Sequence, residues 1–277
     1  MQKVPSIFLV FISLLLASCS KDVFFTNGPT VEEDRLVEGH FRFLEMHDNV
    51  NVRLVHRDRQ DNPDLTPIHI ETGENLIPKI RTAIHGDTLT IGNDNTLNWL
   101  RNYDYPLNVT VYYDSIYKIT FDSNGDLVTD TLRGMVSHDE GNSLTTIRVN
   151  IIGGSGNLNL AVHCQRLHTN YEFGTACLTT KGSARIAYTT TNYNSHGPID
   201  DLALETNIHY IYAYGTNDIK VKAFHEIQAR NQNNGSIYYL KYIGKRWNYQ
   251  TQSFDDVHCP EVVNSDGHNI FPIEQDQ

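Results

Sequence analysis

The chain has 277 residues, and its 33 acidic and 22 basic side chains give a formal net charge of -11 at pH 7. This acidic balance argues against nucleic-acid binding, because that affinity comes mainly from Lys and Arg that neutralise phosphates. The 15 tyrosines, the many Thr and Asn residues and the lack of Leu-rich heptads favour β structure.

The first 18 residues have the plan of a secretory signal. Lys3 precedes an apolar run that is too short for a permanent membrane helix, and small residues come directly before Cys19. With a cysteine after the small pair, the segment resembles a bacterial lipobox, in which the thiol is acylated, as with palmitate, and the bond before the cysteine is cut. We therefore expect residues 1–18 to be a lipoprotein signal peptide and Cys19 to be the lipidation site. An ordinary signal peptide or a membrane helix with a chance cysteine is the alternative.

The lipid on Cys19 would be the contact with a membrane, because no later stretch is long and apolar enough to span a bilayer. Each buried methylene contributes about 0.8 kcal/mol, so several acyl chains hold a protein firmly. Ser20 stands where Asp is associated with retention in the inner membrane, so we expect an outer-membrane lipoprotein on the periplasmic or the surface face. Residues 19–34 lack periodicity and are predicted to be a tether.

From residue 35 onward, short runs alternate between apolar and polar residues, as in residues 50–55 and 68–71. This alternation predicts strands with one face in a core and one in water. Turn signals such as Gly86-Asp87 separate the runs. Residues 74–81 are expected to form a short turn or helical piece.

The second half carries glycines that each precede a short apolar or alternating run. Their separations are 18, 23, 18 and 20 residues, for Gly156, Gly174, Gly197, Gly215 and Gly235. Such self-similarity predicts a solenoid of stacked units with parallel strands and an inward column of Leu, Ile and Val. An antiparallel meander with regular hairpins is the alternative.

Residues 68–80 (IHIETGENLIPKI) and 87–91 (DTLTI), together with the glycine-headed runs, resemble the head GIN domain family of auto-transporter adhesins. The resemblance covers residues 35–243. It implies a secreted or lipid-anchored bacterial protein without agreed catalytic residues. It also implies an all-β, right-handed parallel β-helix-like solenoid, here with an irregular N-terminal β part. The repeat is lost in residues 244–277, which we expect to be a C-terminal cap or tail.

No motif predicts a metal site, a cofactor or a catalytic residue. The histidines of the repeat half lack metal-ligand spacing and are expected to face solvent, although His209 and His225 could meet on adjacent units. Asp201 and Asp218 lie about one repeat apart, and solvated turn positions are the interpretation we favour for both. Buried or incidental roles are expected for Cys164, Cys177 and Cys259, and a disulfide between the first two stays open.

Tyrosines are the candidate ligand-binding residues. In the run from Tyr210 to Tyr214, alternation places Tyr210, Tyr212 and Tyr214 on one face. If this face points outward, it is a flat surface suited to the sugar rings of a glycan or to a protein ligand. If it points inward, it fills the core, and partial burial in the core is the interpretation we favour.

The sequence thus predicts a lipid-anchored cell-envelope protein, an adhesin-like or structural binding module without catalysis. The alternative from another class is a glycan-active β-helix enzyme, a polysaccharide lyase or hydrolase. A cluster of Asp or Glu with Arg or Lys in a groove would favour the enzyme.

Overall fold

The computed structural model describes residues 27–57, 64–95, 105–137, 144–241, 244–248, 253–257, 261–264 and 267–274. Within these residues every element is a strand except the short 3-10 helix η1 (Ile77–Lys79), so the all-β prediction is confirmed. The strands before the repeat half are β1 (Thr30–Glu38), β2 (Phe43–Asp48), β3 (Asn51–His56), β4 (Leu65–Gly73), β5 (Ile80–His85), β6 (Thr88–Asn93), β7 (Asn108–Tyr113), β8 (Lys118–Ser123), β9 (Leu127–Thr129), β10 (Leu132–Arg133) and β11 (Met135–Ser137). The later strands are β12 (Leu144–Gly154), β13 (Asn157–Gly174), β14 (Cys177–Ser195), β15 (Ile199–Ala213), β16 (Asp218–Val221), β17 (Glu226–Asn231), β18 (Ser236–Lys241), β19 (Gly244–Asn248), β20 (Ser253–Val257), β21 (Glu261–Asn264) and β22 (Ile270–Glu274).

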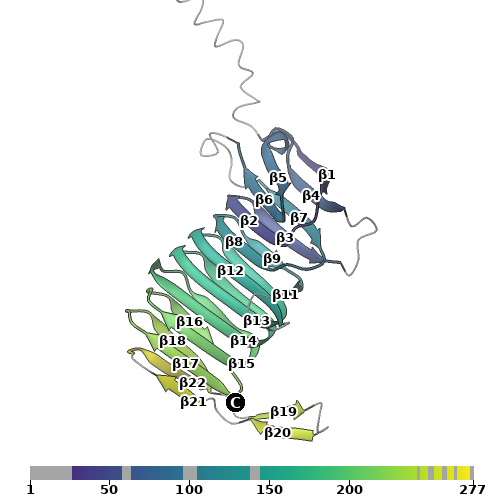
Figure 1. Cartoon of the computed structure of the whole chain (residues 1–277). Helices are drawn as coiled ribbons and strands as arrows, with labels where there is room; N and C mark the ends of the chain where they lie inside the picture. The colour runs from purple at the N-terminus through teal and green to yellow at the C-terminus, as the bar shows by residue number, and fades with distance from the viewer. Residues whose placement is uncertain are drawn as a thin grey trace, which may run out of the picture.

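A single 20-stranded sheet folds back on itself and encloses the core between two faces. Face A has the order β5, β6, β2, β8, β12, then the second halves of β13, β14 and β15, then β17 and β21. Face B has the order β1, β4, β7, β3, β9, then the first halves of β13 to β15, then β16, β18 and β22. The three long strands therefore belong to both faces, and they lie side by side in the middle of the molecule (Figure 1).

A column of aliphatic side chains runs through the core beneath face B. Its members pair in register on successive strands, and each is at most 1% exposed: Leu158, Leu178, Ile199, Ile219 and Ile237. Burying one such side chain contributes about 1.5 to 3 kcal/mol. The predicted inward column is confirmed.

The part before β12 mixes antiparallel pairs, such as β1 with β4 and β5 with β6, with parallel ones, such as β2 with β8. β1 begins at Thr30, so residues 30–34 of the predicted tether belong to the sheet. The acidic pair Glu32-Glu33 obscured the alternation of this strand in the sequence. In the structure Glu32 points to solvent, whereas Glu33 lies beside Arg35. The predicted short turn or helical piece at residues 74–81 is confirmed by η1.

The pairs that link β12 to β18 are all parallel, so the antiparallel meander is wrong for this region. The register shows that the marked glycines occupy two neighbouring corner positions. Gly156 and Gly197 share one position, which is Ala176 in the unit between them. Gly174 takes the position two residues earlier, where the next unit has Ser195. Successive units at one position are thus 20 or 21 residues apart as far as β16 and 18 residues apart from β16 to β18, whereas the glycine spacings are 18, 23, 18 and 20 residues.

The end of the chain contains two kinds of pairing. β19 and β20 form an antiparallel pair of their own, which stands apart from the stack in Figure 1. β21 and β22 continue the parallel ladders of β17 and β18. Among the helices of the described residues, none has the length and apolar character needed to cross a membrane.

Candidate functional site

A row of large side chains crosses the strands on the outer side of face A. In register, neighbouring strands place Arg148, His168, Tyr188 and Tyr210 side by side. Phe43 and Tyr117 extend the row toward β2, with ring centroids 6.0 Å apart in an edge-on pair, and Arg148 Nε donates to the Tyr117 hydroxyl at 3.0 Å. We call these six residues the aromatic rail: Phe43, Tyr117, Arg148, His168, Tyr188 and Tyr210.

The rings at the centre of the rail stack on one another. The centroids of His168 and Tyr188 are 4.6 Å apart, and those of Tyr188 and Tyr210 are 5.0 Å apart, with interplanar angles of 6° and 16°. Each contact of this kind contributes about 0.5 to 1.5 kcal/mol. Because stacking covers the ring faces, the rail presents ring edges and polar atoms to solvent. Desolvation raises the pKa of Tyr210, and the electrostatic effect of the nearby Tyr188 adds to this rise. The hydroxyl of Tyr210 therefore keeps the proton that it can donate.

Tyr210 and Tyr212 lie on the outer side of face A, and Tyr214 directly follows the end of β15, so their interpretation as partial core filler is wrong. Ile211 and Ala213, which alternate with them, are the buried residues, whereas Tyr212 is 41% exposed. The run was ambiguous because both alternating sets are apolar enough to fill a core. The smaller set fits between the two faces, and the rings remain outside.

Further exposed rings lie where β13 and β14 leave face A. Tyr214 lies 5.8 Å from Tyr193 between ring centroids, and Tyr193 is 65% exposed. Phe173 pairs with Asn194 on the neighbouring strand and is 57% exposed. The sequence prediction missed Phe173, and it did not predict that the residues of the aromatic rail lie side by side. The recurrence of aromatic rings at positions 168, 188 and 210, about one unit apart, was the available signal.

A second row runs beside the rail and carries amides, hydroxyls and one guanidinium. Its members pair in register on five neighbouring strands: Asn150, Asn170, Thr190, Tyr212 and Arg230. Together the two rows offer hydrogen-bond donors and acceptors beside exposed aromatic surface. This arrangement can contact an extended ligand that lies across the strands.

Asp201 and His209 are buried, so the predictions of a solvated turn and of a solvent-facing histidine are wrong for them. Asp201 is 1% exposed and His209 is 0% exposed, and His209 Nε2 lies 3.7 Å from Asp201 Oδ2. The Thr180 hydroxyl donates to Asp201 Oδ1 at 2.5 Å, and the Thr189 hydroxyl lies 2.8 Å from His209 Nε2. These threonines face inward and supply the polar contacts of Asp201 and His209. Because they lie on the neighbouring strand, about 20 residues away in the chain, the sequence around Asp201 and His209 does not reveal them.

The expected pairs across units do not form. β17 aligns Ile227 with His209, and exposed His225 lies two residues away from that register. Asp201 pairs with Val221 rather than with Asp218. Across the described part of the chain, no group of three or more His, Cys, Asp or Glu side chains could hold a metal ion.

The thiols of Cys164 and Cys177 are free, so the disulfide left open between them is not formed. Cys164 is buried, and burial raises the pKa of its thiol to about 12. This thiol therefore remains protonated and unreactive, as the predicted buried role requires. Cys19 and Cys259 lie outside the described residues.

Comparison with known proteins agrees with this architecture. A family model described as "Putative auto-transporter adhesin, head GIN domain" matches residues 40–241. A crystal structure named as a putative adhesin from Bacteroides fragilis is similar at 18% identity and a TM-score of 0.67, over 90% of this chain and 99% of that chain. One named as a putative lipid binding protein from Parabacteroides distasonis has 13% identity and a TM-score of 0.56, over 89% and 98%. These likenesses show a shared fold, and no curated protein matches the chain.

Proposed function

The chain belongs to the head GIN domain family, and from this membership we propose that it is a lipid-anchored cell-envelope protein that acts by binding, as an adhesin-like or structural module without catalysis. The observation that supports binding is the aromatic rail, which presents ring edges, hydroxyls and a guanidinium along one face. A glycan is the favoured ligand because the neighbouring row adds amide and hydroxyl groups that match sugar hydroxyls. A protein ligand is the other outcome of the test below.

The units of the repeat half are proposed to wind as coils of a right-handed parallel β-helix-like solenoid. Parallel pairing on both faces and a corner spacing of 20 or 21 residues from β13 to β15 support this winding. A crystal structure tests it through the direction in which the chain passes from face B to face A.

Changing Cys19 to Ser is expected to release the protein from the membrane fraction, because it removes the thiol that carries the lipid. Fractionation of cells and labelling with radioactive palmitate measure the effect: the unmodified protein should be labelled and sediment with outer membranes. Changing Ser20 to Ala is the matched control and should leave both readouts unchanged. A Cys19→Ser variant that still sediments with membranes would contradict the proposal.

Changing Tyr210, Tyr212 and Tyr214 together to Ala is expected to weaken ligand binding at least about tenfold, because aromatic anchors dominate binding energy at such surfaces. A glycan and matrix-protein array identifies the ligand and measures the loss. Tyr210→Phe separates the two contributions of one ring, because it keeps the stack on Tyr188 and removes only the hydroxyl.

The matched control is Tyr238→Ala on face B. Tyr238 also packs its ring on a neighbour, with its centroid 5.7 Å from that of Phe271, but it lies on the opposite face. Far-UV circular dichroism should show that both variants keep their fold. If Tyr238→Ala weakened binding as much as the triple change, the outer side of face A would not be the binding surface.

The glycan-active enzyme remains the alternative proposal. One observation favours it, namely a hollow at the other end of face A that contains Asp48, Arg81 and Asp94. Incubation of the ligand with the protein distinguishes the two functions. Binding without new reducing ends supports the module, whereas release of products supports the enzyme.

A further inference from the structure

A polar hollow of about 460 Å³ lies on the outer side of face A, where β5, β6 and β2 meet. It is lined mainly by His47, Asp48, Arg81, His85, Thr90 and Asp94. None of these residues belongs to the aromatic rail. Its size falls within the range of small-molecule sites.

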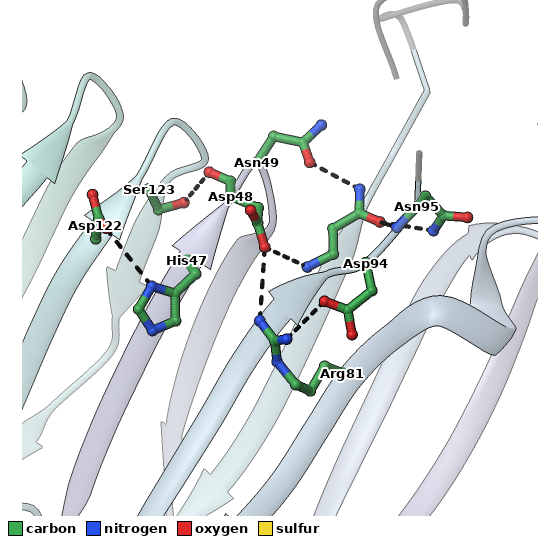
Figure 2. Close-up of polar contacts among 9 residues, drawn as sticks. His47, Asp48, Asn49, Arg81, Asp94, Asn95, Asp122 and Ser123 are labelled. Carbon is green, nitrogen blue, oxygen red and sulfur yellow. Dashed lines mark hydrogen bonds and ion pairs between the residues drawn. The ribbon is translucent and has the colours of Figure 1, made fainter. Parts of the chain in front are cut away.

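Arg81 lies between the two carboxylates of the hollow (Figure 2). Its Nη1 is 2.7 Å from Asp94 Oδ1, and its Nη2 is 3.9 Å from Asp48 Oδ2. Gly92 on β6 makes this position available, because a Cβ there would overlap the Arg81 guanidinium. A missing side chain thus allows the guanidinium to lie across β6.

Asp48 is held in place through both its carboxylate and its backbone carbonyl. Asp48 has a left-handed backbone, with φ of 64°, and its Oδ2 accepts a 2.9 Å hydrogen bond from the backbone N–H of Asn93. Its carbonyl oxygen accepts another, at 2.8 Å, from the Ser123 hydroxyl (Figure 2). A residue outside its ordinary backbone region is held by such surroundings, and this pattern is frequent at ligand sites. The hollow is therefore organised before any ligand arrives.

The charges select the kind of ligand. One guanidinium faces two carboxylates, and Asp122 lies 3.8 Å from the His47 ring at the edge of the hollow. This excess of negative charge disfavours anions. Among the described residues, these contacts use one oxygen of each carboxylate, so Asp48 Oδ1 and Asp94 Oδ2 remain as acceptors for a ligand.

From these features we infer that the hollow binds a neutral saccharide unit. Sugar hydroxyls both donate and accept, so neighbouring hydroxyls can donate to the two carboxylates and accept from Arg81 or an imidazole. Thr90 adds a hydroxyl to the same lining. The inference is independent of the proposed function, because it uses no residue of the rail.

Isothermal titration calorimetry on the full chain in detergent tests the inference with three probes: a neutral methyl hexoside, glucuronic acid as an anion and glucosamine as a cation. The neutral hexoside should give saturable heat, and glucuronic acid should bind at least about tenfold more weakly. Absence of saturable heat with neutral hexosides, or binding of glucosamine alone, would overturn the assignment. Release of methanol from the hexoside would make the hollow an active site and would overturn it too.

Gly92→Ala is the most selective variant. Its backbone suits an L residue and the clash is with the end of a flexible side chain, so it should displace the Arg81 guanidinium and weaken binding at least about tenfold without unfolding the chain. Arg81→Gln and Asp94→Asn should act in the same direction. Arg53→Gln and Glu38→Gln, which change exposed charges on face B, are the matched controls, and Tyr210→Ala should retain binding. Equal losses in the controls would refute the assignment.

Discussion

Changing Gly197 to Ala is expected to destabilise the folded chain by about 3 to 5 kcal/mol, because the corner has no room for a methyl group. A Cβ on Gly197 would overlap both the carbonyl oxygen of Ala176 and the hydroxyl of Tyr171. The first is backbone of the preceding unit. The second belongs to a fully buried ring whose hydroxyl donates to that same carbonyl at 2.7 Å. Relief of either clash therefore breaks a buried hydrogen bond or moves the ladder.

The following unit also holds this corner. Asn217 Nδ2 donates to the carbonyl oxygen of Gly197 at 2.7 Å, and the Ser195 hydroxyl donates to Asn217 Oδ1 at 2.7 Å. Urea unfolding followed by circular dichroism measures the loss. Gly86→Ala is the matched control, because its φ of 61° is strained for Ala but no atom lies within 4 Å of the new Cβ, so it should cost about 1 to 2 kcal/mol. Equal losses in the two variants would contradict the steric argument.

The repeat was predictable from glycine, but its true period was not. Position 156 recurs as Ala176, Gly197 and Asn217, so glycine marks this corner in only some of the units. The intervening glycines, as at Gly174, belong to a different position two residues earlier. Glycine is needed where a Cβ would clash with the backbone of the preceding unit. Whether such a clash arises depends on the local backbone path of each corner. The spacing of glycines alone therefore predicted a repeat of about 20 residues, but it included a spacing of 23 residues that the strand register does not contain.

Alternation predicted which side chains share a face, but not which face is buried. Tyr210 and Tyr212 share the outer side, as expected, and the core side carries Ile211. His209 enters the core because an inward hydroxyl from the neighbouring strand, that of Thr189, lies beside it. Such a partner lies 20 residues away in the chain. The binding face and the buried polar pair both depend on register, which one sequence does not specify.

Single changes of Asp201 and His209 are expected to make stability depend on pH in opposite directions. Burial raises the pKa of the Asp201 carboxyl to about 7; the hydrogen bond from Thr180 opposes this rise, and the charge of Asp200 adds to it. Burial lowers the pKa of His209 to about 3. Both groups are therefore neutral together in weakly acidic solution, which avoids the cost of burying a charge.

The signs follow from the protons that each state binds. Between pH 4 and 7 the folded chain keeps a proton on Asp201 that the unfolded chain has lost, so this group makes stability fall as pH rises. Between pH 3 and 6.5 the unfolded chain holds a proton on His209 that the folded chain excludes, so this group makes stability rise with pH. Each effect amounts to about 4 to 5 kcal/mol at most, and the two largely cancel between pH 4 and 6.5 in the unchanged protein.

Removing one partner should expose the effect of the other. Asp201→Asn keeps a group that can bond to Thr180 and leaves His209, so its stability should rise from pH 3 to 6.5. His209→Gln leaves Asp201, so its stability should fall from pH 4 to 7. Urea unfolding at each pH, referred to the double variant, isolates these slopes from all other titrating groups. Slopes of reversed sign would contradict the prediction, because the remaining group would then be stabilised in its charged form in the core.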